Sequence, residues 1–164
     1  MTVINTTKDV KTLTLTLVAE FDAGPDRVWE VWEDPRQLER WWGPPTYPAT
    51  FTRHDFVVGG ESRYFMTGPS GDTPHGWWRI DALDRPHRLE FANGFAGDDG
   101  EPAPEVEPMA GSVTFEVVPG GTRMTVVWRF VDLEQMEKLS AMGMQEGLIQ
   151  AVGQIDALLV SSPV

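Results

Sequence analysis

The chain has 164 residues, a net charge of −12, seven tryptophans and no cysteine. The acidic balance argues against nucleic acid and against an anionic membrane surface as partners, because proteins bind both through clustered Lys and Arg. The lack of cysteine excludes disulfides, thiolate metal sites and a cysteine nucleophile.

The N-terminal residues 1–10 give no sign of a targeting segment, because they lack a basic region followed by an apolar run. No stretch of about 18 apolar residues occurs anywhere in the chain, so no membrane-spanning helix is predicted. We therefore expect one cytoplasmic domain over residues 1–164, with its core at about residues 10–160.

The first predicted element is a half-buried strand over residues 11–21, where apolar and polar side chains alternate. Two short helices follow. Pro25 suits a first helical position, and Asp34 is a good N-cap for the second helix. That helix carries two adjacent tryptophans and ends at the Gly-Pro-Pro sequence of residues 43–45.

The next predicted elements are strands joined by short turns, which favour an antiparallel meander. They cover residues 49–58, 61–67, 76–83, 88–95, 112–118 and 122–131. The chain then closes with one long helix from about Asp132 to Val160, with Asp132 as N-cap and Gln135 in the capping-box position. The expected fold class is α+β, with a curved antiparallel β-sheet wrapped around a long C-terminal helix.

The segment of residues 97–111 is rich in proline and acidic residues and predicts an extended loop. Its acidic residues are Asp98, Asp99, Glu101, Glu105 and Glu107. Length and proline content allow the part over residues 98–108 to act as a lid over a cavity, but nothing in the sequence requires it.

Several motifs together resemble the START-related SRPBCC superfamily, in the branch of the activator of the heat-shock-protein ATPase (AHSA-like). They are VWEVWEDPRQLERWWGPP, the Gly-Gly pair before ESRYFMTGPSGDTPHGWWRIDALDRPHRLEF, then GGTRMTVVWRF and the Gly143/Gly147 pair. The Trp-Trp-Gly-Pro element is the most specific of these motifs. The resemblance covers about residues 12–160 and implies a helix-grip fold with an apolar cavity between the last helix and the sheet.

The chain departs from the family pattern in two places. Val57 and Val58 stand where family members often carry Arg-Pro, and Leu148 stands where they often carry Trp. The first departure weakens any transfer of a basic group to that turn, and the second predicts a cavity of locally different shape. Because members of the superfamily differ widely in activity, the resemblance by itself does not select a function.

Catalytic patterns are weak in this sequence. His54, His75 and His87 lack metal-ligand spacing, so we predict neither a metal nor a cofactor and interpret the three as turn or surface residues. There is no Gly-x-Ser-x-Gly nucleophile motif and no phosphate-binding glycine loop. A raised-pKa acid or base inside the cavity stays open as an alternative. Its candidates are Arg79, Asp81, Asn93, Gln145, Glu146 and Gln150, although strand alternation equally allows Arg79 and Asp81 to face solvent.

The aromatic and methionine residues give the best candidates for a binding site, because aromatic walls and adaptable methionines suit an apolar ligand. Each of them could instead be ordinary core, and we expect one of the adjacent tryptophans to pack in the core and the other to face the cavity. The predicted cavity residues are Trp41, Trp42, Tyr64, Met66, Trp78, Phe91, Phe95, Trp128, Met142, Met144 and Gln145.

The leading functional hypothesis is therefore binding of a small hydrophobic or aromatic molecule between the sheet and the C-terminal helix. One alternative is a cyclase- or hydrolase-like enzyme with a cavity acid or base. Another is a co-chaperone that stimulates a heat-shock-protein ATPase. The resemblance also leaves room for a homodimer formed through an edge strand or the Trp-rich hairpins.

Overall fold

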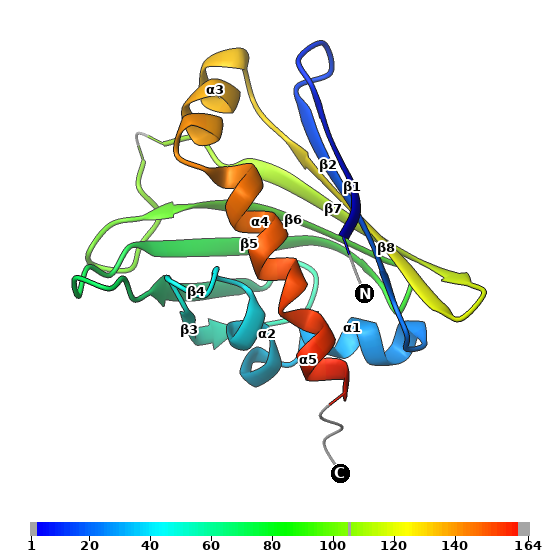
Figure 1. Ribbon diagram of the computed structural model, residues 1–164. Coiled ribbons are helices and arrows are strands. Elements are labelled where there is room, and N and C mark those ends of the chain that lie inside the picture. Colours follow the sequence, from blue (N-terminus) through cyan, green and yellow to red (C-terminus); the bar gives the residue numbers. More distant parts are fainter. Residues whose placement is uncertain (1–2, 105, 161–164) are drawn as a thin grey trace.

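Eight strands form one antiparallel sheet in the computed structural model, which describes residues 3–104 and 106–160 (Figure 1). The strand order is β1-β2-β8-β7-β6-β5-β4-β3. The strands are β1 Val3–Asp9, β2 Thr14–Phe21, β3 Ala49–His54, β4 Glu61–Met66, β5 His75–Asp84, β6 Arg88–Ala96, β7 Met109–Val118 and β8 Gly121–Arg129. This arrangement confirms the predicted α+β class and the antiparallel meander from β3 to β8.

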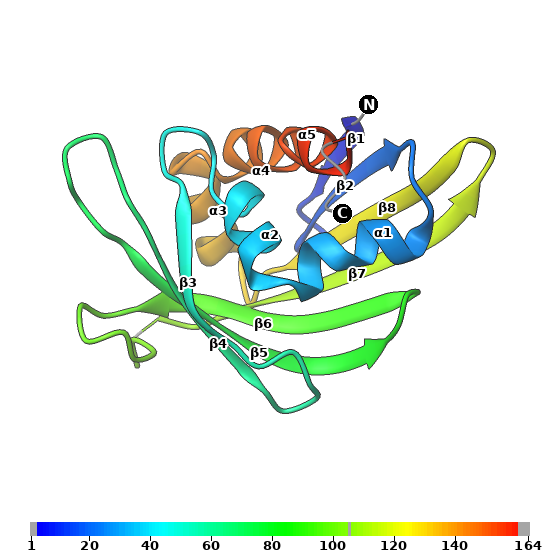
Figure 2. The ribbon, with the colours of Figure 1, turned by 90° about the horizontal axis from the view of Figure 1, so that it is seen from below.

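The sheet curves strongly, and all the helices lie on its concave side (Figure 2). Irregular register between Phe51 and Arg53 in β3, and between Ile80 and Ala82 in β5, marks β-bulges that increase local bending. Alternate residues of β2, β5, β6, β7 and β8 are buried on this side. The curved inner face therefore supplies one wall of the core, and the helices supply the other.

The two short helices follow β2 as predicted: α1 spans Pro25–Glu33 and α2 spans Pro35–Trp41. The side chain of Asp34 accepts a hydrogen bond from the backbone N–H of Arg36 at 2.9 Å, which confirms it as the N-cap of α2. The chain leaves α2 through Gly43, where a Cβ would collide with the carbonyl oxygen of Tyr47. Only glycine fits this exit, which places Trp42 at the edge of the helix pair.

The single long C-terminal helix predicted from the sequence is divided in the structure. Three helices replace it, α3 Leu133–Ala141, α4 Met144–Gly153 and α5 Ile155–Val160. The break between α3 and α4 occurs at Gly143, whose φ of 85° is left-handed and cannot continue a right-handed helix. Helices α4 and α5 run across the concave face in nearly one line, while α3 turns away at one end of the sheet (Figure 1).

The predicted capping of this region is confirmed, with a small change in geometry. Asp132 accepts a hydrogen bond from the N–H of Gln135 at 2.8 Å, and the side chain of Gln135 accepts one from the N–H of Val131 at 2.9 Å. In a standard capping box, the Gln135 side chain would accept a hydrogen bond from the N–H of the N-cap residue Asp132, but here it accepts one from the preceding residue, Val131. The two reciprocal hydrogen bonds fix the first turn of α3.

Residues 3–9, for which the sequence predicted no element, form strand β1. β1 pairs with β2 from Val3↔Ala19 to Asp9↔Thr14. It is an edge strand that lies largely exposed, so it lacks the apolar alternation by which a strand is recognised in a sequence.

The core is dominated by aromatic side chains beneath α1 and α2. Trp29, Trp32, Trp41 and Trp78 are each at most 2 % exposed. The indole N–H of Trp32 donates to the sulfur of Met124 at 3.4 Å, and that of Trp41 donates to the carbonyl of Val31 at 2.8 Å.

Among the described residues, none of the helices combines the length and apolarity needed to cross a bilayer.

Candidate functional site

A largely apolar cavity of about 280 Å³ lies between the sheet and the helices α3 and α4. Its walls come from the end of α2, from β4, β6 and β8, and from both sides of the α3–α4 break. The cavity is partly open, because α3 diverges from the direction of α4 at Gly143. The helix break that the sequence did not predict therefore helps to form the cavity.

Seven of the eleven predicted cavity residues border this space. They come from α2, three strands and the helix break, and they are Trp42, Tyr64, Met66, Phe95, Trp128, Met142 and Met144. Trp42, Tyr64 and Trp128 form the buried end, at 8 %, 8 % and 1 % exposure. Met142, at 65 % exposure, lies at the open end.

The other four predicted residues do not line this cavity, and each has a different partner. Trp41 borders a void of about 10 Å³ that Trp42 also lines, and its N–H donates to the carbonyl of Val31. Trp78 and Phe91 stack on each other in the core at a centroid distance of 4.3 Å. The amide of Gln145 donates to the hydroxyl of Thr6 on β1 at 3.1 Å. Strand and helix periodicity could not separate these residues from the cavity residues, because all of them belong to the same concave side.

Other cavity residues were missed by the sequence reasoning. Met109, and Leu139 of α3, add apolar wall. Leu148, whose departure from the family pattern predicted a cavity of locally different shape, lines it as well. Glu107 and Gln135 lie at the rim, where the amide of Gln135 donates to the carbonyl of Glu107 at 2.6 Å. The end of the acidic loop is thereby fastened to α3, although Glu105 of the same loop lies outside the described residues. Nothing local in the sequence indicated this contact, because its partners are 28 positions apart.

The buried end of the cavity has a defined polar structure. The amide nitrogen of Asn93 donates to the Tyr64 hydroxyl and to the carbonyl of Trp77, both at 3.1 Å. Because a carbonyl only accepts, the second bond fixes the orientation of the Asn93 amide. The ring of Trp42 meets that of Tyr64 edge-on at 6.0 Å and that of Trp128 at 6.2 Å. These aromatic rings therefore form one continuous wall.

Burial raises the pKa of Tyr64 above its ordinary value of 10.0, so the phenol is neutral at physiological pH. The Asn93 amide and the nearby Trp42 indole oppose this rise. The Trp42 N–H nevertheless makes no hydrogen bond of acceptable geometry within the described chain. Gly76, opposite Tyr64 on β5, has no side chain because a Cβ there would collide with the Tyr64 ring.

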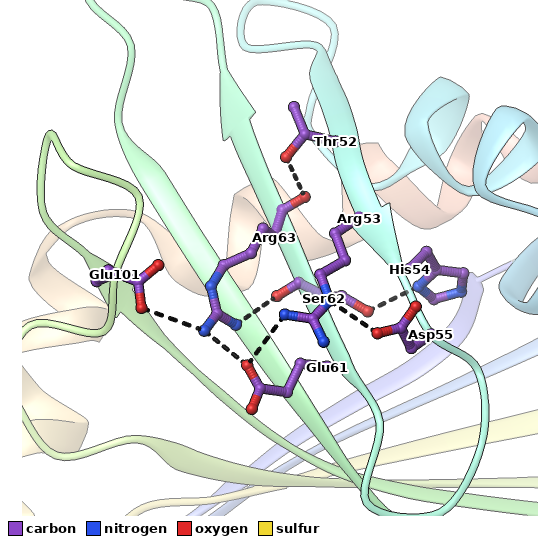
Figure 3. A network of polar contacts seen from close by, with 8 residues as sticks. All are labelled: Thr52, Arg53, His54, Asp55, Glu61, Ser62, Arg63 and Glu101. Atoms are coloured by element: carbon purple, nitrogen blue, oxygen red, sulfur yellow. Dashed lines mark hydrogen bonds and ion pairs between the residues drawn. The ribbon is translucent and has the colours of Figure 1, made fainter.

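A second polar arrangement, on β3 and β4, includes a serine and a histidine in contact (Figure 3). His54 Nδ1 lies 2.7 Å from the Ser62 hydroxyl, and Nε2 lies 2.9 Å from the carbonyl of Trp32. Nε2 must donate to that carbonyl, so in the neutral ring the Ser62 hydroxyl donates to Nδ1. Burial lowers the pKa of His54 below 6.5, which keeps the ring neutral near pH 7.

This Ser-His pair does not have the surroundings of a nucleophilic site. Ser62 is 0 % exposed, and neither residue borders the cavity. Around the pair, Arg63 lies between Glu61 and Glu101 at 2.6 and 3.8 Å, which links β4 to the acidic loop (Figure 3). The expectation that His54 is a turn or surface residue is wrong, because its half-buried ring joins β3 to the end of α1.

The remaining acid–base candidates are not gathered at the cavity. Arg79 and Asp81 pair with each other at 2.9 Å on the exposed side of β5, and Glu146 and Gln150 are exposed on α4. Asn93 alone of the six candidates borders the cavity. Within residues 3–104 and 106–160, no group of three or more His, Asp or Glu side chains is placed to hold a metal ion.

The chain matches the family model of the Activator of Hsp90 ATPase homolog 1-like proteins over residues 22–160. No curated protein gave a significant match. Solved structures, in contrast, include similar proteins over almost the full chain.

A protein from Arthrobacter aurescens is 49% identical, with 97% of this chain and 92% of that chain covered and a TM-score of 0.92. A protein from Mycobacterium smegmatis is 43% identical, with 99% of each chain covered and a TM-score of 0.89. The AHSA1 protein from Silicibacter pomeroyi is 21% identical, with 90% and 97% covered and a TM-score of 0.72, a likeness of fold alone.

Proposed function

The chain belongs to the family of Activator of Hsp90 ATPase homolog 1-like proteins, and we propose that it binds a small hydrophobic or aromatic molecule in its helix-grip cavity. The observation that carries this proposal is the cavity of about 280 Å³ between the sheet and the α3–α4 break. It is walled mainly by tryptophan, methionine and leucine side chains. An apolar ligand in this space would remove its own surface and the cavity wall from water together.

The methionines favour a ligand that is held by shape. Met66, Met109 and Met144 are partly buried against the core and border the cavity. Their unbranched, polarizable side chains adjust to a flat or irregular ligand at small cost. The indole rings of Trp42 and Trp128 are rigid, so the cavity combines fixed and adaptable wall surfaces.

The chemistry of the walls favours binding over catalysis. Glu107 at the rim and the neutral Tyr64 are the ionisable residues among those that line the cavity. A general base needs an ionisable group within hydrogen-bond reach of the reacting atom. The cyclase- or hydrolase-like alternative would have to rely on Glu107 or on Tyr64 as a proton donor, so turnover of a bound molecule is an outcome that the binding experiment should also detect.

A co-chaperone role is the second candidate, because the family is described by activation of the Hsp90 ATPase. This role requires a protein-binding surface rather than a cavity. The matching test adds the purified protein to a bacterial Hsp90 and measures ATP hydrolysis. A rise in the rate of ATP hydrolysis that persists when the cavity is filled would favour this role over ligand binding.

The binding proposal is tested by native mass spectrometry of the protein purified from cells, followed by calorimetric titration with neutral bicyclic aromatics. Gly147→Leu is the blocking variant, because Gly147 lines the cavity and a Cβ there meets nothing within 4 Å. Gly153→Leu is the matched control. It lies on the same helix with equal free space around its Cβ, but it does not border the cavity.

We expect a bound mass or micromolar titration in the native protein and in Gly153→Leu, and a loss of at least tenfold in affinity in Gly147→Leu. Equal binding by both variants would place the ligand outside the cavity and contradict the proposal. The proposal also keeps the cytoplasmic location expected from the sequence and the homodimer for which the family resemblance leaves room. Size-exclusion chromatography with light scattering tests the dimer.

A further inference from the structure

The open end of the cavity carries a carboxylate that the described chain leaves without a partner. Glu107 lies at the rim, where its backbone carbonyl accepts the hydrogen bond from the Gln135 amide at 2.6 Å. The carboxylate itself makes no hydrogen bond and no ion pair with any described residue. Because the side chain is exposed, the backbone is held at the rim while the carboxylate can turn toward a charged group at the open end.

An exposed aromatic ring lies at the same end of the cavity as this carboxylate. Asn93 and Met109 form the last pair of the β6–β7 ladder, and Phe95 and Glu107 lie two residues beyond it on the two chain segments. Phe95 lines the cavity and is 41 % exposed. The face of an aromatic ring attracts a cation, so this end of the cavity offers a positive group two favourable neighbours.

No positive charge of the protein offsets Glu107 at the cavity. Of the described residues that line it, none is Lys, Arg or His. Lys138, in the last turn of α3, is exposed, lies outside the cavity lining and makes no ion pair with Glu107. The chain as a whole carries a net charge of −12. We therefore expect a negative potential at the open end, which favours a cation there and disfavours an anion.

We propose, on the basis of the binding function proposed above, that the ligand is an amine with an apolar or aromatic body, bound as its ammonium cation. The body fills the cavity against the tryptophan rings and the methionines, and the ammonium group stays at the open end, near the Glu107 carboxylate and the ring of Phe95. In this arrangement the charge keeps part of its hydration, which avoids the large cost of burying an isolated ion. A carboxylate of the same shape would meet only a like charge at the open end.

Three naphthalenes of similar shape separate the charge of the ligand from its apolar body. 2-(Aminomethyl)naphthalene is a cation at neutral pH, 2-naphthalenemethanol is its neutral counterpart, and 2-naphthoate is an anion. Each is titrated into the native protein by calorimetry at low and at high salt concentration. Because salt screens exposed charges, the change between the two conditions reports the electrostatic part of the affinity.

Two glutamine variants separate the local carboxylate from the overall charge of the chain. Glu107→Gln removes the charge at the open end and keeps the length of the side chain. Glu116→Gln is the matched control, because Glu116 is also exposed and without a partner among the described residues, but it lies outside the cavity lining. It is seven residues from Met109 along β7, a distance of about 23 Å. Both variants change the net charge by the same amount.

We expect the amine to bind about threefold more tightly than the alcohol at low salt, with naphthoate the weakest. The advantage of the amine should shrink at high salt and in Glu107→Gln, and persist in Glu116→Gln. Equal binding of the amine and the alcohol, or an advantage that both variants reduce alike, would overturn the amine proposal and leave the cavity function intact. Tightest binding of naphthoate would have the same consequence. No binding of any of the three compounds would overturn both proposals.

Discussion

Aromatic side chains occupy both ends of the concave face, but they pack closely at one end and border a cavity at the other. Under α1 and α2, the ring of Trp32 packs edge-on against Trp41 at a centroid distance of 4.7 Å and tilted against Trp78 at 6.2 Å, and the three rings close the space. Toward α3, Trp42 and Trp128 have neighbours on one side and a cavity of about 280 Å³ on the other. Aromatic content therefore does not distinguish core from cavity in this protein.

The position of the helices makes the difference. At the closed end, the amide of Gln154, between α4 and α5, donates to the carbonyl of Gly43 at 2.7 Å, which holds these helices against the end of α2. At the open end, Gly143 turns the chain, and α3 leaves the line of α4. The space that one straight helix would have covered is left to methionines and, in our proposal, to a ligand.

The strongest test of this contrast removes an aromatic ring from the closed end. Trp32→Ala should lower the free energy of unfolding by about 3 to 5 kcal/mol, because it deletes a fully buried ring and its hydrogen bond to Met124. Met142→Ala, at the open end and 65 % exposed, should change it by less than about 0.5 kcal/mol. Urea denaturation measures both, and similar losses would show that the open end is as tightly packed as the core.

A second test concerns the helix break itself. Gly143→Ala places a Cβ on a residue with φ of 85°, which should cost about 1 to 2 kcal/mol of stability. Gly147→Ala, four residues further on and inside α4, should instead stabilise by about 0.5 to 1 kcal/mol. If both alanines stabilised, the left-handed turn would not be present in solution, and α3 and α4 would form one helix.

Smaller changes in stability are expected when leucine replaces either of two glycines of α4. Gly147→Leu and Gly153→Leu should each raise the free energy of unfolding by about 0.5 to 1 kcal/mol, because leucine favours a helix and neither Cβ meets another atom within 4 Å. Thermal unfolding of the two variants checks this equality. A clear loss of stability in Gly147→Leu alone would mean that the cavity closes in solution.

The smallest effect concerns pH and lies at the closed end, where His54 joins β3 to α1. Burial lowers the pKa of His54 in the folded protein below 6.5, so the unfolded chain binds this proton more tightly. Its contribution to stability is therefore complete above about pH 6.5 and declines as the pH falls below that value. His54→Gln should reduce the loss of stability between pH 7 and pH 5 in urea denaturation, and an unchanged slope would show that His54 does not titrate in this range.

Local sequence patterns were sufficient for most of the fold. The alternation in residues 122–131, the Pro25 and Asp34 start signals and the Asp132 cap each depend on neighbours within a few positions, and each was predicted correctly. The errors had physical causes. Strand β1 lies largely exposed at an edge and carries no apolar pattern, and an isolated glycine within an apolar stripe does not reveal whether its φ is positive.

The same distinction between local patterns and long-range packing applies to the candidate site. By itself the sequence indicated most of the elements, their order and the concave side to which the aromatic residues belong, because these follow from periodicity and short-range capping. Only the tertiary structure decided that Trp42 borders the cavity while Trp41 binds Val31, and that Glu107 meets Gln135. These outcomes depend on how distant elements pack and on where the helix breaks, and residues on one face of an element share the same periodicity whether they meet a neighbour or an empty space.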